Sequence, residues 1–413
     1  MTQPTVTSLR AIAVPAYGPT VLASTGTGAV TAVYALSARD LGASIGLAAF
    51  VVALLGIGQL VGDLPAGALA ARFGERRALL LAAGAEALGM LGCALAPGVG
   101  WLAASVLFVG LANAVFGLAR QAFLTDAVPI GLRARALSTL GGVHRIGVFV
   151  GPFVGAWVVA RWGVQAAYGV GVVASGLAFL LLATYGELPG ADAGVRAVAA
   201  RGSDRARPSV RTVLAAHRRV LLTLGVGVVF VSGARAARNA VVPLWAEAVG
   251  LDAAATSLVF GISGAVDMLL FYPAGWVMDR YGRALVAVPS MLVMGAGMVL
   301  LPGTHTFATV TAAACLIGVG NGMGAGIVMT LGADVSPLLG RPQFLGGWRL
   351  MADVGWAGWP ALVSLVAAVA PLSVAVAAIG AVTIAGGGWL AVWVPRYDPV
   401  SRRTVDRARR RPA

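Results

Sequence analysis

The chain has very few charged residues, and it contains no lysine. Asp, Glu, Lys and Arg together make up 11% of the 413 residues, and all 30 of the cationic side chains are arginine. A soluble globular domain contains roughly 25% charged residues, so this composition excludes that class of protein. Because 59% of the residues are hydrophobic and the mean hydropathy is +0.87, the sequence indicates a protein embedded in a lipid bilayer.

Groups for metal, disulfide and nucleotide chemistry are also scarce. The two cysteines, Cys93 and Cys315, fall in different hydrophobic runs, so neither a disulfide nor a metal site is expected. The polar segments contain no Gly-rich phosphate loop of the Walker type, which excludes the usual machinery of ATP-driven transport. No combination of Ser, His and Asp is typical of a catalytic site. We therefore expect a protein that is not an enzyme and that needs no cofactor.

Hydrophobic runs long enough to cross a bilayer follow one another along the whole chain. About 20 apolar residues in a helix span the hydrocarbon core of about 30 Å. Helices are expected because lipid cannot satisfy the open edge of a sheet. The twelve predicted membrane helices are 15–38, 45–69, 78–96, 101–124, 136–160, 163–185, 219–245, 253–277, 284–302, 306–331, 344–369 and 371–394. The fold class is therefore an all-α membrane protein with twelve transmembrane helices.

The sequence contains an internal repeat with an offset of 208 residues. Residues 42–152 align with residues 250–360 without a gap, and turn, kink and charge positions recur, as in Gly74 with Gly282, Pro65 with Pro273 and Arg72 with Arg280. This pattern predicts two pseudo-symmetric six-helix bundles around a central cavity. The expected division is an N-terminal bundle (1–185), a basic cytoplasmic linker (186–218), a C-terminal bundle (219–394) and a basic cytoplasmic tail (395–413).

The arginines are distributed unequally between the two sides of the predicted membrane. Of the 30, 23 fall on the side of both termini, five lie within helices, and two, Arg39 and Arg161, lie on the other side. This bias predicts a multi-pass protein of the cell inner (cytoplasmic) membrane with both termini cytoplasmic. The positive charge is explained by topology and by attraction to anionic lipid, so nucleic acid is not an expected partner. We expect a monomer.

Two short loops at equivalent repeat positions resemble the signature loop of the major facilitator superfamily. The first copy contains Gly67, Arg72 and Gly74, and the second contains Gly275, Asp279, Arg280, Gly282 and Arg283. The family pattern has an aspartate before the first arginine, and the first copy has Ala71 there. The resemblance implies a secondary transporter in which helices 1, 4, 7 and 10 line a cavity, helix 2 lies against helix 11, and helix 5 lies against helix 8.

A glycine motif on the fifth predicted helix resembles the motif of the proton-driven drug antiporter branch of that superfamily. Its residues are Gly147, Gly151, Pro152 and Gly155, with Ala156 where the family pattern usually has a further glycine. The three glycines share one helix face, and small residues also let any two membrane helices pack closely. An export signature and a plain packing seam therefore both remain open.

Charged residues inside predicted membrane helices indicate gating or proton coupling, because each costs roughly 2.5–3.5 kcal/mol at a helix centre. Arg145 and Asp267 lie at similar depth, about 14–15 Å from the cytoplasmic side at 1.5 Å per residue. Asp63 and Arg349 also share one level. We predict two ion pairs across the seam between the halves, with Asp353 and Asp63 competing for Arg349. The alternatives are permanent pairs, pairs within one half, or an Arg349–Asp353 pair at i, i+4 spacing.

The substrate site is expected around the seventh predicted helix. Its polar residues are joined by repeat mates on helices 4 and 10, which gives the set Ser232, Arg235, Arg238, Asn239, Asn113 and Asn321. Two guanidinium groups favour phosphate or carboxylate groups. The alternative is that both arginines are solvated charges at the rim of the membrane.

These observations favour a proton-coupled exporter of a small amphipathic or anionic molecule, working by alternating access. A proton-coupled importer of a small metabolite is the alternative, and a membrane sensor without transport is less favoured.

Overall fold

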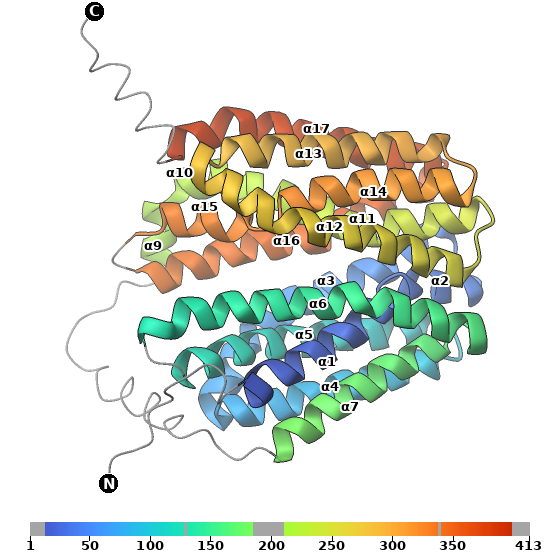
Figure 1. Cartoon of the computed structure of the whole chain (residues 1–413), viewed down its shortest axis with the longest axis horizontal. Helices are drawn as coiled ribbons and strands as arrows, with labels where there is room; N and C mark the ends of the chain where they lie inside the picture. Colours follow the sequence, from blue (N-terminus) through green and yellow to red (C-terminus); the bar gives the residue numbers. More distant parts are fainter. Residues whose placement is uncertain (1–12, 128–129, 185–209, 338–339, 399–413) are drawn as a thin grey trace, which may run out of the picture. The chain divides into compact units, whose positions relative to one another are not determined.

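The computed structural model describes residues 13–127, 130–184, 210–337 and 340–398. Within these ranges the chain is helical and contains no strand. The first part comprises α1 (Ala13–Val30), α2 (Val33–Asp40), α3 (Ile45–Phe73), α4 (Glu75–Ala94), α5 (Val99–Ala127), α6 (Ile130–Trp162) and α7 (Ala166–Thr184). The second comprises α9 (Val210–Ala216), α10 (Arg218–Val220), a π-helical turn (Leu221–Gly225), α11 (Val226–Ala248), α12 (Ala253–Tyr281), α13 (Ala284–Leu300), a 3-10 turn (Leu301–Gly303), α14 (Phe307–Met323), α15 (Ile327–Val335), α16 (Arg341–Val369) and α17 (Leu372–Tyr397) (Figure 1).

The predicted fold class is confirmed. Among the described residues, eleven helices are long and apolar enough to cross a membrane, or twelve if α1 and α2 form one span bent by 42°. The bend follows Thr31, whose hydroxyl donates to the carbonyl of Thr27 at 2.7 Å, a local bond that often bends helices. The predicted run 306–331 is interrupted between α14 and α15, where Gly324 and Gly326 weaken the helix.

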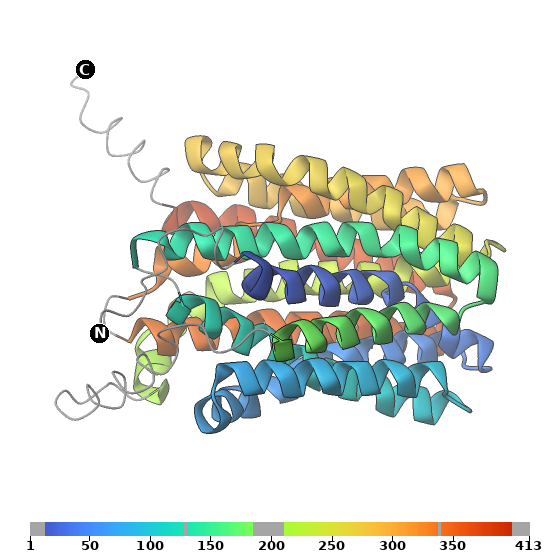
Figure 2. The same cartoon turned by 60° about the horizontal axis from the view of Figure 1, so that its bottom comes forward.

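Contacts between α-carbons divide the chain into two compact units. Met1–Ala43 and Leu54–Ala206 form the first unit, and Ser44–Ala53 with Arg207–Ala413 form the second. In the first unit α1 packs on α6 and α7, while α4 packs on α5 and α7. In the second unit α11 packs on α16, α12 packs on α14, and α13 packs on α14 and α17 (Figure 2). Most of the predicted basic linker and tail lies outside the described residues.

The internal repeat is visible in the packing of each unit. A side chain at Gly110 would overlap the backbone carbonyl of Leu55, which brings α5 and α3 into backbone contact. A side chain at Gly318 would lie 2.5 Å from the carbonyl of Ser263, which does the same for α14 and α12. Both members of the second pair lie 208 positions after their counterparts in the first. The repeat therefore preserves individual contacts and not only the pattern of helices.

The glycine motif of α6 forms a packing seam with α1. A Cβ at Gly151 would lie 2.5 Å from the carbonyl of Thr25, and one at Gly155 would lie 2.5 Å from that of Ala29. Gly147 likewise contacts Ser24 and the backbone of Val21. Pro152 lies inside this helix. The small residues are thus required for the approach of the two helices, whatever further role the motif has.

At the repeat position of Gly151 the second unit has a large residue in place of glycine. Trp359 on α16 replaces Gly151, and it lies against Gly233 of α11, which occupies the position of Thr25. Phe230 packs edge-on to the Trp359 ring, with the centroids 5.5 Å apart. The larger side chain of this contact therefore comes from α1 (Thr25) in the first unit and from α16 (Trp359) in the second.

Candidate transport site

Among the described arginines of the second unit, Arg238 on α11 is the most buried. Its guanidinium lies 3.6 Å from the Oδ2 atom of Asp267 on α12. It also donates to the Ser263 hydroxyl at 2.8 Å and lies over the Phe260 ring, 5.2 Å from its centroid. Arg238 is 7% exposed, so it is not a solvated charge at the rim. Ser263, Phe260 and Asp267 share one face of α12 because they are three and four residues apart.

Asn321 of α14 completes this cluster. Its Nδ2 group donates to Oδ2 of Asp267, and its backbone carbonyl accepts from the guanidinium of Arg235 at 3.3 Å. The contact depends on the neighbouring Gly322, because a Cβ there would lie 2.9 Å from the α-carbon of Asp267. Glycine therefore lets α14 approach α12 closely enough for the Asn321 side chain to reach the carboxylate.

The cluster contains two guanidinium groups, one carboxylate and unsatisfied acceptors. It combines the guanidinium groups of Arg235 and Arg238 with the carboxylate of Asp267. The buried Oδ1 atoms of Asp267 and Asn321 have no hydrogen-bond partner within the described part of the chain. Buried polar atoms are nearly always paired in native proteins, so such atoms require an explanation. A ligand with an acceptor for the arginines and a donor for these oxygens would satisfy both needs.

Within the described part of the chain, no hydrogen bond joins the other three predicted substrate residues to this cluster. Ser232 is buried on α11, and Asn239 is half-buried on the same helix. Asn113 is half-buried on α5, in the first unit. Their assignment to the substrate site remains a prediction.

Three of the predicted coupling residues, Asp267, Arg349 and Asp353, have ion-pair contacts within the second unit. Arg349 Nε lies 3.8 Å from Oδ2 of Asp353, the i, i+4 pair on α16 that the sequence left open. Asp267 is paired with Arg238 of its own unit. Asp63 on α3 and Arg145 on α6 are half-buried in the first unit. The ion pairs predicted across the seam remain untested predictions.

The first unit has a buried carboxylate of its own, Glu86 on α4. From the sequence we expect Glu86 to extend toward the membrane surface or to pair locally. It is 1% exposed, and the Thr27 hydroxyl lies 3.3 Å from Oε1, so it pairs locally inside the bundle. Arg120 of α5 is close enough to interact electrostatically with Glu86 and with His144. Thr27 occupies the repeat position of Arg235, so the same place on the first helix of each unit is polar.

Both signature loops turn at a glycine with a positive φ angle. Gly74 has φ of 81° and Gly282 has φ of 103°, a backbone conformation that residues with a Cβ rarely adopt. The arginines before these turns contact aromatic rings, Arg72 over Phe73 at 5.4 Å and Arg280 over Trp276 at 5.5 Å. Gly275 lies in the last turns of α12, and a Cβ there would meet no other atom within 4 Å. For Gly67 only the helical backbone of α3 is described.

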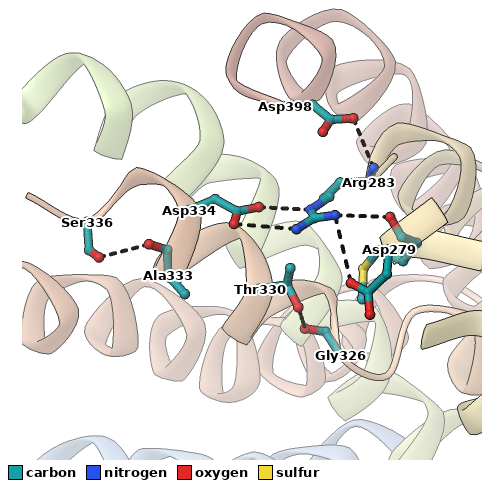
Figure 3. A network of polar contacts seen from close by, with 9 residues as sticks. Asp279, Arg283, Gly326, Thr330, Ala333, Asp334, Ser336 and Asp398 are labelled. Carbon is teal, nitrogen blue, oxygen red and sulfur yellow. Dashed lines mark hydrogen bonds and ion pairs between the residues drawn. The ribbon is translucent and has the colours of Figure 1, made fainter. Parts of the chain in front are cut away.

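The second signature loop carries a network of charges centred on Arg283 (Figure 3). The guanidinium of Arg283 lies 2.9 Å from Asp334 Oδ2 and 3.8 Å from Asp279 Oδ1, and its backbone N–H donates to Asp398 at 3.0 Å. Burial lowers the pKa of Arg283, but the hydrogen bond with Asp334 and the charges of Asp334, Asp398 and Asp279 outweigh it, so the pKa is raised. Glu75 occupies the repeat position of Arg283, so the first loop has a carboxylate where the second has this guanidinium.

Comparisons with known proteins identify the family. The sequence model of the Major Facilitator Superfamily matches residues 20–337 and 224–412. The chain belongs to the major facilitator superfamily. Its fold is that of membrane transporters and not of enzymes.

Other members of this superfamily are similar to the chain in part of the sequence or in fold. Multidrug resistance protein Stp of Mycobacterium tuberculosis (strain CDC 1551 / Oshkosh) is 30% identical over 139 residues, which are 33% of this chain and 26% of Stp. The chain thus spans about a quarter of the length of that relative.

Among solved structures, a POT family transporter in complex with a thioalcohol-conjugated peptide matches with a TM-score of 0.76 and 12% identity, covering 94% of this chain and 96% of that one. The xylose transporter XylE from E. coli, in an inward-open conformation, matches with a TM-score of 0.72 and 16% identity, covering 94% and 97%. The nucleoside transporter NupG matches with a TM-score of 0.72 and 13% identity, covering 92% and 100%.

Sequence reasoning missed two groups of residues in this superfamily member. Ser263 and Phe260 were not predicted around Arg238, although their spacing from Asp267 places them on one helix face. Asp334 and Asp398 were not predicted as partners of Arg283, because the folding of distant segments toward the signature loop is not encoded in any local pattern.

Proposed function

We propose that this protein is a proton-coupled secondary transporter that exports a small amphipathic or anionic molecule by alternating access. The observation that supports this most strongly is the buried cluster of Arg238, Asp267, Asn321 and Arg235. Ionisable groups inside the membrane are energetically costly, so where they occur they usually have a function. Here two guanidinium groups, a carboxylate and unsatisfied acceptors lie together.

The cluster supports a substrate that combines an acidic or strongly accepting group with a hydrogen-bond donor. A carboxylate or phosphate group would bind the guanidinium of Arg238 in place of Asp267. A donor on the same molecule would satisfy the Oδ1 atoms of Asp267 and Asn321. The two guanidinium groups of the cluster disfavour a simple organic cation.

The same cluster links substrate and proton. When a substrate anion takes Arg238, Asp267 loses its cation at 3.6 Å while it stays largely shielded from water. The substrate anion and the ionised Asp267 compete for one guanidinium, whereas a proton on the carboxylate removes this competition, so the binding of anion and proton is linked. The residues proposed for gating and further coupling are Asp63, Arg145, Arg349 and Asp353.

The direction of transport is proposed to be export. The glycine motif of α6 and the partial similarity to a multidrug resistance protein support it. One observation favours a second candidate, uptake of an anion together with a proton. Because the Arg238–Asp267 pair lets anion and proton bind cooperatively, an anionic substrate would travel with the proton. Exchange against protons instead requires a substrate that binds better to the ionised site than to the protonated one, as a neutral molecule that donates a hydrogen bond to the Asp267 carboxylate would.

Reconstitution into liposomes tests the proposal. Vesicles with an imposed pH gradient of either orientation are loaded with a neutral amphipathic dye or with an organic anion, and flux is followed with and without the gradient. Arg235→Gln and Arg238→Gln are expected to reduce anion flux, while Arg218→Gln, at an exposed site on α10, serves as the control. Export is supported if dye leaves against proton entry, and it is refuted if every flux follows the proton. If no compound responds to the gradient, proton coupling is wrong.

A further inference from the structure

An open apolar groove of about 440 Å³ runs along the first unit between α1, α6 and α7. Its walls include Leu22 and Thr25 of α1, Val158 of α6, and Val173 and Leu177 of α7. Val173 and Leu177 are well exposed. These helices cross the membrane, so the groove faces the hydrocarbon and not water.

Apart from the indole N–H of Trp162 at its surface end, the walls of the groove offer a ligand no free hydrogen-bonding side chain. Thr25 is the one residue with a hydroxyl among those lining it, and that hydroxyl already donates to the Val21 carbonyl of its own helix at 2.8 Å. The other lining atoms are almost entirely hydrocarbon. A polar substrate would lose its hydration there without compensation. The chemistry therefore selects a hydrocarbon chain.

The length of the groove matches one leaflet of a bilayer. On α7 it runs from Ala166, at the end of the turn after α6, to Leu177 in the middle of the helix. At 1.5 Å per residue this distance is about 16 Å, roughly half of the 30 Å hydrocarbon core. A chain that entered at the membrane surface would end near the bilayer centre.

The surface end of the groove has groups suited to a lipid headgroup. Trp157 and Trp162 at the end of α6 are exposed and pack edge to face with centroids 5.2 Å apart, and Trp162 lines the groove. Tryptophan is enriched at the level of lipid headgroups. Between them lies Arg161, which is exposed and has no hydrogen bond or ion pair to the described residues. Arg39, the other arginine expected on this side, donates to the backbone of Ala43.

From this geometry we propose that the groove is a binding site for one anionic phospholipid. One acyl chain lies between α1, α6 and α7, and the phosphate group lies at Arg161. With both termini cytoplasmic, as predicted from the arginine distribution, the lipid belongs to the opposite, non-cytoplasmic leaflet. The proposal does not depend on the direction or the substrate of transport.

Lipid retention by the purified full-length protein tests the proposal. The protein is reconstituted with phosphatidylglycerol and phosphatidylcholine, washed with detergent, and weighed by native mass spectrometry. Gly169 lines the groove, and a Cβ at this position meets no atom within 4 Å, so Gly169→Leu is expected to project into the groove. Gly117 on α5 has the same open surroundings outside the groove, which makes Gly117→Leu the matched control.

The wild type and Gly117→Leu are expected to retain one phosphatidylglycerol, and Gly169→Leu is expected to retain at least tenfold less. Arg161→Gln should still retain lipid but should lose the preference for phosphatidylglycerol over phosphatidylcholine. Equal retention by Gly169→Leu and the wild type would overturn the acyl-chain site. Unchanged preference in Arg161→Gln would overturn the headgroup assignment. A wild type that retains no lipid would refute both.

Discussion

Removing the negative charge of Asp267 is the most direct perturbation of the transport site. In Asp267→Asn, Arg238 keeps its bond to Ser263 and its contact with Phe260, but it becomes a buried cation without a counter-charge. At 3.6 Å and an effective dielectric constant of about 20, the attraction between the two charges is at most about 4–5 kcal/mol. Losing one partner of a buried pair costs about 3–5 kcal/mol, and we expect the lower end because Asp267 keeps some exposure.

The double variant isolates the interaction of the two side chains. In Arg238→Gln with Asp267→Asn, neither charge is left unpaired, so the double variant should be more stable than the sum of the single losses predicts. A coupling of about 2 kcal/mol is expected, within the range for residues in direct contact. Thermal unfolding in detergent of the four proteins measures this cycle. Asp252→Asn is the matched control, because Asp252 caps α12 through the Ala255 N–H and asparagine caps helices equally well.

The same variants have a functional outcome. Asn at 267 mimics the protonated carboxylic acid, so anion binding to Asp267→Asn should be tight and should no longer change with pH. In this variant the anion no longer has to displace the Asp267 carboxylate from Arg238, and a gain of about 3 kcal/mol in binding free energy corresponds to a roughly hundredfold lower dissociation constant. Strictly additive stability losses, or anion binding that keeps the pH dependence of the wild type, would refute the pairing as the link between substrate and proton.

Three further predictions concern stability. Gly282→Ala should lower the free energy of unfolding by about 1–2 kcal/mol because φ is positive there. The control Gly264→Ala lies inside α12 with open space around it and should not destabilise the protein. Equal melting temperatures of the two variants would contradict this. Gly147→Leu should cost about 1–3 kcal/mol by separating α6 from α1, whereas Gly142→Leu on the same helix meets no neighbour and should be tolerated. Arg283→Gln should cost about 2 kcal/mol, since a charged hydrogen bond to Asp334 is lost. Because the pKa of Arg283 is raised, its charge is present at all pH values below that pKa, and the difference in melting temperature should not change between neutral and mildly alkaline pH.

Much of the architecture could be predicted because the bilayer restricts what a sequence can form. Helix number, the repeat and the tight turns at Gly74 and Gly282 follow from hydrophobic length, from the 208-residue offset and from glycine positions. The observed helices are often longer than predicted, as in α6, which begins at Ile130 rather than at residue 136. Polar residues at a helix end look like loop in a hydropathy pattern but still continue the helix.

The site was predicted less completely because partners depend on packing. The set Arg235, Arg238, Asn321 and Asp267 was recognised as charged or polar within the membrane, yet Asp267 was assigned to gating and the others to substrate. In the folded unit these residues form one cluster, because Gly318 and Gly322 bring α14 against α12. Such approach distances are properties of two helices together and cannot be obtained from either one alone.

In the first half, Gly151 of the fifth helix packs on Thr25 of the first helix, and in the second half the small residue, Gly233, packs on the large one, Trp359. This reversal restricts how the two halves can be recombined. A chimera that places α6 in the position of α16 would leave Gly151 opposite Gly233 and open a void. The reverse transplant would force an indole ring onto Thr25. The first and fifth helices of either half can therefore be transferred between the repeats only together, because the large residue of one fits the small residue of the other.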